Sequence, residues 1–424
     1  MGTFLPKWYI RLMTMKNTAN ISFLCISFFL LSTFTAIRAQ TSGDRHKQIA
    51  EKLSEFASSI GLDKRTSILE LRKIDSIRPS YRILISDSTL RLPLQRQLDM
   101  DANHITIVPL PDSTVEGKQR GLINLSVANL RTQPSHAAEM ATQVLLGTAV
   151  DILQKQGGDF RVRTPEGYIA WVPTSSVSPK TENELRNWID GHRIIYTNEF
   201  GKSLSAPDRK SLRVSDLVYG NILALLGEDK QFYHVAYPDG RQAFVPKDEA
   251  VRFDEWLKSR SPSAENVLNS AKSMLGLPYL WGGTSVKGVD CSGFTKTSYF
   301  MNGLVIPRDA SQQVLHGQPV DILDSVGNFD AEKALKNLKP ADLLFFAGGK
   351  NRSSHARVTH VALYLGNGQF IHAAGTVRIN SMLKQAADYD DFQARTVVAA
   401  RRYLQTTDTG IQKIDMSRYY NNVK

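Results

Sequence analysis

The feature that most constrains the fold is an internal repeat in the middle of the chain. The stretches FRVRTPEGYIAWVP (160–173) and YHVAYPDGRQAFVP (233–246) align with an offset of 73 residues. The same offset pairs Gly147 with Gly220 farther upstream. Each copy contains short alternating runs broken by a turn signal, Pro-Glu-Gly or Pro-Asp-Gly, which indicates short antiparallel strands.

Strands of this kind, about 60 residues of them in each copy, predict a small closed β-barrel, since closure leaves no strand edge exposed. We therefore predict two tandem barrels, at residues 120–182 and 190–252. The alternative is one larger all-β domain with internal symmetry.

The N-terminus has the pattern of a secretory signal peptide. Residues 1–39 hold four basic residues and no acid, and an uncharged apolar run over residues 21–37 is followed by the small residue Ala39. The alternative is a retained membrane anchor, because the run nearly reaches spanning length. We expect residues 1–39, and with them Cys25, to be removed, which predicts an exported protein.

The remaining boundaries follow from local patterns. Residues 40–119 begin with an amphipathic helix that places Ile49, Leu53, Phe56 and Ile60 on one face, and we predict a helical region there. Ser263 is a suitable N-cap for a new helix that opens the last domain, residues 260–404. Residues 405–424 are predicted to be a polar tail.

The charge of the chain is basic but scattered. Removal of the four basic residues of segment 1–39 lowers the formal charge from +11 to +7. This excess suits anionic partners such as cell-wall polymers. No long Lys/Arg run or aromatic-interleaved basic motif is present, so we expect no nucleic-acid partner.

Cys291 is the single cysteine expected in the mature chain, and its surroundings favour a nucleophile over an inert core residue. In KGVDCSGF, Gly288 permits a sharp turn and Asp290 is a suitable N-cap, so Cys291 would lie in the first turn of a helix. A helix start lowers a thiol pKa, whereas the charge of Asp290 raises it. A cationic partner must therefore lie close, which predicts a histidine.

Two histidines fall in THVALYLGNGQFIHAAG (359–375), which reads as a hairpin. A three-residue loop with Gly368 in the left-handed region would place Leu365 opposite Gln369 and His360 and His372 on one face. A two-residue loop would place the histidines on opposite faces. The first arrangement permits a Cys–His–His relay. A single strand histidine is more often structural, and the spacing of ligands makes a metal site improbable, so we expect no metal and no cofactor.

Together the motifs LPYLWGGTSVKGVDCSGF, RDASQQ, DLLFF and THVALYLGNGQFIHAAG resemble the NlpC-type papain-like cysteine peptidases of bacterial cell walls, over residues 262 to about 403. The resemblance implies an α+β fold, with a papain-like catalytic domain preceded by the two SH3-like barrels and the helical N-terminal segment. It implies that Cys291 is the nucleophile, His360 the base and His372 the orienting residue. Tyr279 and the Cys291 backbone N–H would hold the oxyanion.

A second resemblance reaches upstream. NLRTQPSHAAEMATQVLLGTAVDIL (129–153) with EGYIAWVP is similar to the first bacterial SH3-like domain of the subfamily that cleaves γ-D-glutamyl–diamino acid bonds. It implies that a pocket binds the free amine of an N-terminal L-alanine. The residues that this resemblance assigns to the pocket are Glu139, Tyr168, Asp290, Ser292 and Ser311.

The resulting expectation is a monomeric cysteine endopeptidase, periplasmic or extracellular, that hydrolyses the γ-D-glutamyl–diaminopimelate bond of released murein peptides. Its partners would be peptides such as L-Ala-γ-D-Glu-diaminopimelate, with the membrane involved only through the signal segment. We favour a second barrel that braces the first over one that binds wall polymer. The rival hypotheses are a non-catalytic wall-binding protein, and an amidase or acyltransferase on the same scaffold.

Overall fold

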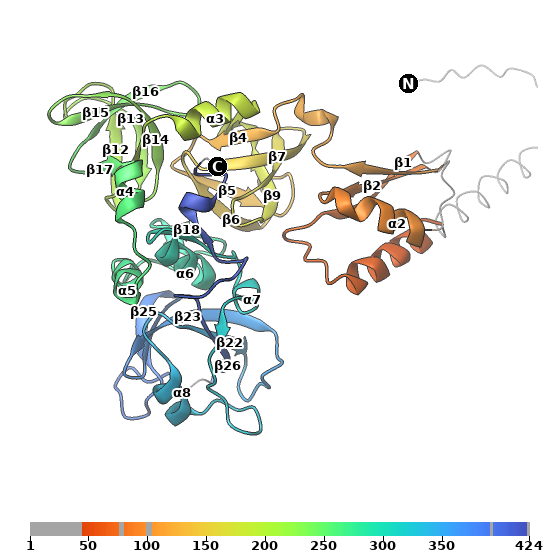
Figure 1. The fold of residues 1–424 in the computed structure, drawn as a ribbon, viewed down its shortest axis with the longest axis vertical. Helices are drawn as coiled ribbons and strands as arrows, with labels where there is room; N and C mark the ends of the chain where they lie inside the picture. Colours follow the sequence, from red (N-terminus) through yellow and green to blue (C-terminus); the bar gives the residue numbers. More distant parts are fainter. Residues whose placement is uncertain (1–44, 76–79, 99–103, 391–392, 422–424) are drawn as a thin grey trace, which may run out of the picture. The chain divides into compact units, whose positions relative to one another are not determined.

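The computed structural model describes residues 45–75, 80–98, 104–390 and 393–421, and the chain divides into two compact units (Figure 1). One unit contains residues 68–109 and the segment before residue 63; the other contains Asp63–Ser67 and the chain from Leu110 onward. The predicted signal segment, with Cys25, lies outside the described residues. Within those residues, no helix has the length and apolar character that crossing a bilayer requires.

The N-terminal unit is not purely helical, so the prediction for residues 40–119 was wrong in part. A helix over residues 45–59 buries Ile49, Leu53 and Phe56 as its pattern predicted. Ile60, which was predicted on the same face, follows the end of the helix and is 45% exposed, so that part of the prediction was wrong. A three-stranded sheet then follows, in the order β1-β2-β3 with β2 and β3 parallel. Its elements are β1 (Leu69–Asp75), β2 (Ser80–Ile85), η1 (Ser88–Leu90), α2 (Arg91–Gln97) and β3 (Ile105–Pro109). Strand β1 was not predicted, because its residues are half-buried or exposed and buried and exposed side chains do not alternate along it.

The first half of the repeat region forms a seven-stranded sheet in the order β10-β4-β7-β8-β9-β5-β6. The short helices η2 (Ser113–Val115) and η3 (Thr174–Ser176) precede β4 and β10. The strands are β4 (Arg120–Ile123), β5 (Val127–Arg131), β6 (Met140–Leu145), β7 (Ala149–Gln156), β8 (Asp159–Arg163), β9 (Ile169–Pro173) and β10 (Val177–Lys180).

Helix α3 (Glu182–Asp190), which begins with a Thr181/Glu184 capping box, connects to a second seven-stranded sheet. Its order is β13-β12-β16-β15-β14-β11-β17, and α4 (Phe253–Ser259) follows it. The strands are β11 (Arg193–Tyr196), β12 (Phe200–Leu204), β13 (Arg213–Val218), β14 (Ile222–Glu228), β15 (Phe232–Ala236), β16 (Gln242–Pro246) and β17 (Ala250–Arg252).

The offset of the sequence repeat recurs in the backbone, because β15 and β16 begin 73 residues after β8 and β9. The paired glycines Gly147 and Gly220 both have positive φ, 77° and 90°. At Gly147 a Cβ would lie 2.1 Å from the carbonyl oxygen of Ile222, so the two sheets approach each other too closely there for any side chain.

The C-terminal part packs helices on a six-stranded antiparallel sheet in the order β21-β26-β22-β23-β24-β25. Helix α5 (Ala264–Lys272) begins at the predicted N-cap Ser263, whose hydroxyl accepts a hydrogen bond from Asn266 N. The other elements are β18 (Thr284–Ser285), β19 (Gly288–Val289), α6 (Cys291–Phe300), β20 (Leu304–Val305), α7 (Ala310–Gln313), β21 (Gln318–Pro319), α8 (Ala331–Asn337), β22 (Leu343–Gly348), β23 (Val358–Gly366), β24 (Gln369–Ala374), β25 (Thr376–Ser381) and β26 (Arg395–Arg402).

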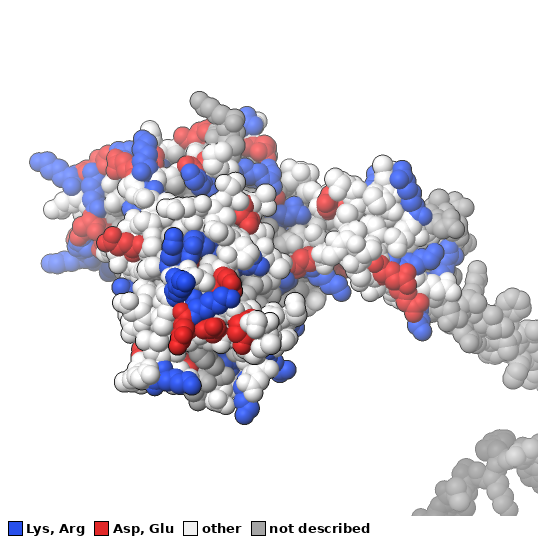
Figure 2. Space-filling view, turned by 60° about the horizontal axis from the view of Figure 1, so that its bottom comes forward, with Lys and Arg blue, Asp and Glu red and all other residues white. Residues whose placement is uncertain are grey.

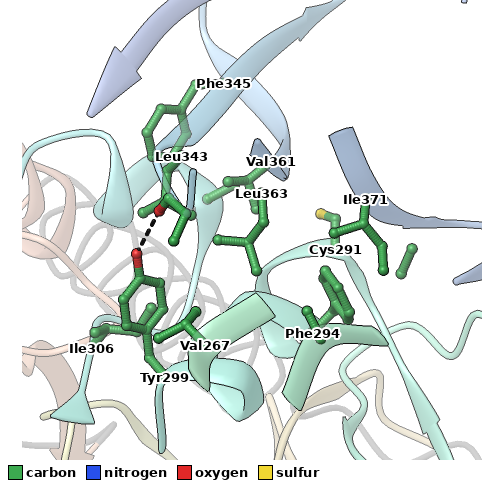
Figure 3. Close-up of a cluster of buried hydrophobic side chains, with 14 of the residues drawn as sticks. Val267, Cys291, Phe294, Tyr299, Ile306, Leu343, Phe345, Val361, Leu363 and Ile371 are labelled. Atoms are coloured by element: carbon green, nitrogen blue, oxygen red, sulfur yellow. Dashed lines mark hydrogen bonds between the residues drawn. The ribbon is translucent and has the colours of Figure 1, made fainter. Parts of the chain in front are cut away.

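Helix α6 lies on the apolar face of this sheet and places the predicted nucleophile at the border of the core (Figure 3). Phe294 from the helix packs in one buried cluster with Val361 and Ile371 from the sheet. Tyr299 also anchors the helix, since its hydroxyl donates to the carbonyl of Ala341 at 2.9 Å. This packing determines where the start of α6 lies relative to β23.

The C-terminal segment is integrated into the fold and is not merely a polar tail. Strand β27 (Gln412–Lys413) pairs with β20, and η4 (Ile414–Met416) follows it. Ile414, Tyr419 and Tyr420 are buried in a cluster that also contains residues of the first sheet and of α6. The dark-blue segment in Figure 1 therefore returns from the six-stranded sheet and its helices to the first seven-stranded sheet.

The surface charges agree with the sequence-based expectation. In Figure 2, Lys and Arg side chains are interspersed with Asp and Glu over the face shown, and no broad field of one sign covers it. A mixed pattern of this kind suits a solvated surface.

Candidate active site

Cys291 is the first residue of α6, as predicted. Asp290 is the N-cap, and its side chain accepts a hydrogen bond from Gly293 N at 2.7 Å. Gly293 must be a glycine because a Cβ there would lie 1.9 Å from the carbonyl oxygen of Gly283. Gly288, at φ 147°, is the first residue of β19 and directly follows the tight turn that connects β18 to it. The sequence VDCSG thus fixes both the start of the helix and the position of the sulfur.

The surroundings of Cys291 raise the pKa of its thiol, although a helix start by itself would lower it. Burial, followed by the charge of Asp290, raises the pKa of the Cys291 thiol to about 12. A backbone hydrogen bond from Val361 and the positive charge of Arg308 act in the opposite direction but do not outweigh them. The cation that lowers the pKa of this thiol is thus an arginine, whereas the sequence predicted a histidine.

His360 and His372 lie on the same face of the hairpin, as predicted, but the predicted three-residue loop is not the reason. The turn is a two-residue one, with Asn367 and Gly368 both at positive φ (50° and 78°) between the paired residues Gly366 and Gln369. A register shift at Leu365 inserts one extra residue into β23. This bulge compensates for the shorter turn and keeps the two histidines on one face.

Three side chains form a continuous hydrogen-bonded chain on this face. His360 Nε2 lies 2.9 Å from His372 Nδ1, and His372 Nε2 lies 3.0 Å from Asn380 Oδ1. Asn380 Nδ2 donates to the carbonyl of Asp388 at 3.0 Å, which fixes the orientation of its amide. Asn380 Oδ1 only accepts, so His372 carries its proton on Nε2 and His360 donates from Nε2. The Nδ1 atom of His360 is then an unprotonated base.

Both imidazoles are held neutral. Burial, then the charges of His372 and Arg395, lower the pKa of His360 well below its usual value. Burial and Arg395 lower the pKa of His372 to about 3, although the hydrogen bond to Asn380 acts in the opposite direction. A neutral thiol thus lies at the start of α6, beside the strand that carries a neutral base.

A cleft of about 300 Å³ opens at Cys291 and brings together residues from three distant parts of the chain. All of the predicted substrate-binding residues line it, together with Tyr279, the proposed oxyanion donor. From the sequence predictions these are Glu139, Tyr168, Tyr279, Asp290, Cys291, Ser292 and Ser311. His360 and His372, in β23 and β24, are not among the residues that line it, although Thr359, the neighbour of His360, is.

Asp290 has less freedom to bind a ligand than the sequence suggested. Its carboxylate accepts hydrogen bonds from Arg308 (2.6 and 3.1 Å), Gly282 N and Gly293 N, and from the hydroxyl of Ser292. These five donors use the acceptor capacity of the two oxygens. Asp290 therefore contributes to the cleft chiefly by binding Arg308 and by capping the start of α6.

Glu139 is the acidic side chain of the cleft that stays exposed. Its Oε1 accepts a hydrogen bond from Trp281 Nε1 at 2.6 Å, and no ion pair among the described residues involves it. Trp281 itself is 61% exposed at the rim. The second carboxylate oxygen of Glu139 is thus available to a cation that enters the cleft.

Four residues of the site were missed by sequence reasoning: Arg65, Trp281, Arg308 and Asn380. Trp281 and Arg308 stand inside the motifs WGGTS and RDASQQ, so their positions beside the site could have been suspected. Arg65 and Asn380 have no local signal, because their partners are supplied by the fold.

The comparisons with known proteins agree with this geometry. Residues 276–396 match the NlpC/P60 family, and residues 130–177 match the bacterial dipeptidyl-peptidase Sh3 domain. A gamma-D-glutamyl-L-lysine dipeptidyl-peptidase of Bacillus cereus is 34% identical over 253 residues, which cover 56% of this chain and 68% of that protein. Dipeptidyl-peptidase 6 of Lysinibacillus sphaericus is 29% identical and covers 64% of this chain and 95% of its own length.

Solved structures give the same result. The crystal structure of an NlpC/P60 family protein from Bacillus cereus ATCC 10987 superposes with a TM-score of 0.55 at 27% identity, over 67% of this chain and 99% of that one. An NlpC/P60 endopeptidase from Photobacterium damselae subsp. piscicida shares the fold, with a TM-score of 0.51 at 17% identity over 68% of this chain and 72% of that one. The cysteine at a helix start, the two matched segments and these relatives together show that the chain belongs to the NlpC/P60 family and is a cysteine peptidase.

Proposed function

We propose that this cysteine peptidase hydrolyses the γ-D-glutamyl–diamino acid bond of cell-wall peptides whose N-terminal L-alanine is free. The observation that carries the proposal is the convergence of Glu139 and Tyr168, from the first sheet, with Ser311 and Cys291 in one cleft. An acid, a phenol and hydroxyls are the partners that a bound ammonium requires. The first sheet, as an SH3-like barrel, would thus supply substrate contacts. We propose that the second sheet is a second such barrel that braces the first.

Bracing is supported by the contacts of the second sheet. Asp216 accepts from Ser126 Oγ at 2.6 Å and pairs with Lys287 at 2.5 Å, so it joins the first sheet and the loop before α6. Asn221 Nδ2 donates to the carbonyl of Ser126 at 2.8 Å. The second sheet therefore holds the first sheet and the catalytic part in register.

In the proposed mechanism, His360 Nδ1 removes the thiol proton of Cys291 as the sulfur attacks the γ-glutamyl carbonyl. The proton passes to the leaving amine, and water then releases the L-Ala-γ-D-Glu acyl group from the sulfur. His372 and Asn380 hold His360 in the required tautomer. Tyr279 and the Cys291 backbone N–H would stabilise the oxyanion, which for one donor is worth about 2.7–4 kcal/mol.

The substrate preference is tested with two peptides, L-Ala-γ-D-Glu-diaminopimelate and its N-acetylated form. We expect the wild-type protein to release diaminopimelate or, from the lysine analogue, lysine. Acetylation should lower kcat/KM by about 10–100-fold, since it removes a charged hydrogen-bond donor worth about 1.5–3 kcal/mol. Mass spectrometry identifies the products, and purified sacculi should yield little.

Glu139→Gln is the matched variant, because glutamine keeps an acceptor for Trp281 but removes the charge. We expect it to raise KM for the free peptide by about 10-fold or more with kcat little changed, and to leave the acetylated peptide unaffected. Equal KM values for wild type and variant would contradict the ammonium subsite and favour an amidase or acyl-transfer reaction.

The relay predicts a pH dependence. Because the pKa values of both imidazoles are lowered, we expect the acid limb of the kcat/KM profile to lie well below pH 6.5. Asn380→Asp places a carboxylate beside His372, opposite the positive charges of Arg378 and Arg395. A negative charge stabilises the imidazolium, so the acid limb should move to higher pH.

Asn380→Leu is the companion variant, since it removes the acceptor and leaves His372 Nε2–H buried without a partner. This should lower kcat by about 10-fold or more, because His372 is no longer held with its proton on Nε2. The acid limb of the kcat/KM profile should not move to higher pH as it does in Asn380→Asp. Stopped assays from pH 4 to 9 measure both variants, and profiles identical to that of the wild type would contradict the relay.

We also propose that the protein is exported, to the periplasm or the cell exterior, and acts as a monomer.

A further inference from the structure

One wall of the cleft comes from outside both segments that match known families. Asp63–Ser67, here called the strap, belongs to the same compact unit as the catalytic part, although the residues on either side of it belong to the N-terminal unit. Arg65 of the strap lines the cleft beside Tyr168 and Ser311, and its side chain is about one third exposed, at 33%.

Arg65 makes a dense set of polar contacts. Its Nη1 donates to Asp309 Oδ2 at 2.9 Å and to Ser311 Oγ at 2.7 Å. Its Nε and Nη2 both donate to Asp63, at 2.8 Å each. Asp63 in turn accepts from Gln312 Nε2 at 2.8 Å, so the strap is bound to α7 by two of its residues.

The strap is also bound to the first sheet. The carbonyl of Arg65 accepts a hydrogen bond from Ile169 N at 2.7 Å, at the residue that follows Tyr168. Arg65 therefore connects the two parts of the cleft that carry Tyr168 and Ser311, and it is held from both sides.

The chemistry of these contacts orients Ser311. An oxygen that accepts one hydrogen bond from a guanidinium keeps one lone pair and its own proton, so Ser311 Oγ can still accept from an ammonium. The planar guanidinium fork fixes this geometry in a way that a lysine ammonium does not.

The charge of the strap does not oppose a cationic ligand. The side chains around the cleft include four carboxylates (Asp63, Glu139, Asp290 and Asp309) and three guanidiniums (Arg65, Arg308 and Arg357). The excess of one negative charge favours a bound ammonium. Removal of one partly exposed positive charge would change affinity only a few-fold, because solvent screens it.

We propose that Arg65 is a positioning residue that sets the specificity of this peptidase for a free N-terminal ammonium, by holding Ser311 and Asp309 in place and connecting them to the Tyr168 loop. This inference rests on the proposed function and extends it to a residue outside the matched segments. The strap is then a third component of the substrate site, beside the first sheet and the catalytic part.

The test compares Arg65→Met, Arg65→Lys and Arg209→Met on the free and the N-acetylated tripeptide. We expect Arg65→Met to raise KM for the free peptide about 10-fold with kcat within about twofold, and so to reduce the preference over the acetylated peptide by the same factor. The KM of Arg65→Lys for the free peptide should lie between those of the wild type and Arg65→Met. Arg209, which bridges Asp248 and Glu249 at 2.6 and 2.8 Å on the second sheet, is the matched control and should change neither KM.

A second measurement guards against a folding defect. Ser311→Ala should raise KM similarly, and the double variant Arg65→Met/Ser311→Ala should be no worse than either single variant, because the two act as a unit. Unchanged or lowered KM in Arg65→Met, or full additivity with Ser311→Ala, would overturn the inference while leaving the proposed function intact. A wild-type protein that does not cleave the free tripeptide would overturn both.

Discussion

Replacement of Cys291 by alanine is expected to lower kcat for L-Ala-γ-D-Glu-diaminopimelate by about 10⁴-fold or more, since one residue carries the covalent step. The side chain is buried and contributes little volume, so the variant should fold and bind the peptide with unchanged affinity. Calorimetric titration of the variant measures that affinity, and single-turnover assays measure the rate.

The kcat of His360→Gln should be as low as that of Cys291→Ala. The double variant Cys291→Ala/His360→Gln should be no slower than either single variant, because base and nucleophile act as a unit. Equal cleavage by wild type and Cys291→Ala would leave a non-catalytic binding protein as the better reading. Slow alkylation of Cys291 by iodoacetamide would not separate the two readings, because burial already raises its pKa to about 12. Turnover is therefore the decisive measurement.

The second large effect is expected on stability, from Arg308→Met. Arg308 is 1% exposed, and its guanidinium holds Asp290 at 2.6 Å and the hydroxyl of Thr142, in the first sheet, at 2.7 Å. Burial alone would lower the pKa of Arg308, but the charge of Asp290 raises it, so the arginine is charged in the core. Its removal leaves Asp290 buried without a counter-ion, which should lower the free energy of unfolding by about 3–5 kcal/mol.

Denaturant titration measures this loss, and two further variants identify its cause. Arg308→Met/Asp290→Asn should recover much of the stability, because the uncompensated charge is gone. Arg209→Met, which disrupts an exposed pair, should leave the denaturation midpoint almost unchanged, because solvent screens the pair. A loss for Arg308→Met as small as that for Arg209→Met would show that an uncompensated charge on Asp290 does not lower the stability of the protein.

Local patterns predicted the parts of the fold that depend on short segments. The repeated glycines, the Ser263 cap and the Asp290 cap are determined by residues within a few positions of one another, and the sequence shows them directly. The hairpin shows the limit: the facing of His360 and His372 was right, yet it arises from a bulge at Leu365 that no residue type announces.

Contacts between distant segments could not be derived in this way. Arg65 meets Ser311 across 246 positions, and Tyr419 meets Asp151 across 268. Both pairs are polar contacts that form only in the folded chain, and neither produces a repeating pattern in the sequence. The pKa of the Cys291 thiol could not be derived either, because burial in the folded protein raises it more than a helix start alone would lower it.

The cleft is assembled from the strap, the first sheet and the C-terminal part of the chain. Sulfur and imidazole lie in the C-terminal part alone, whereas the groups that read the ligand's free end, on the proposed function, are shared among all three. Substitutions in the strap or the first sheet would then change the preferred peptide and leave the cutting chemistry in place. Conversely, a transplanted C-terminal part would keep its reactive groups and only a share of its selectivity.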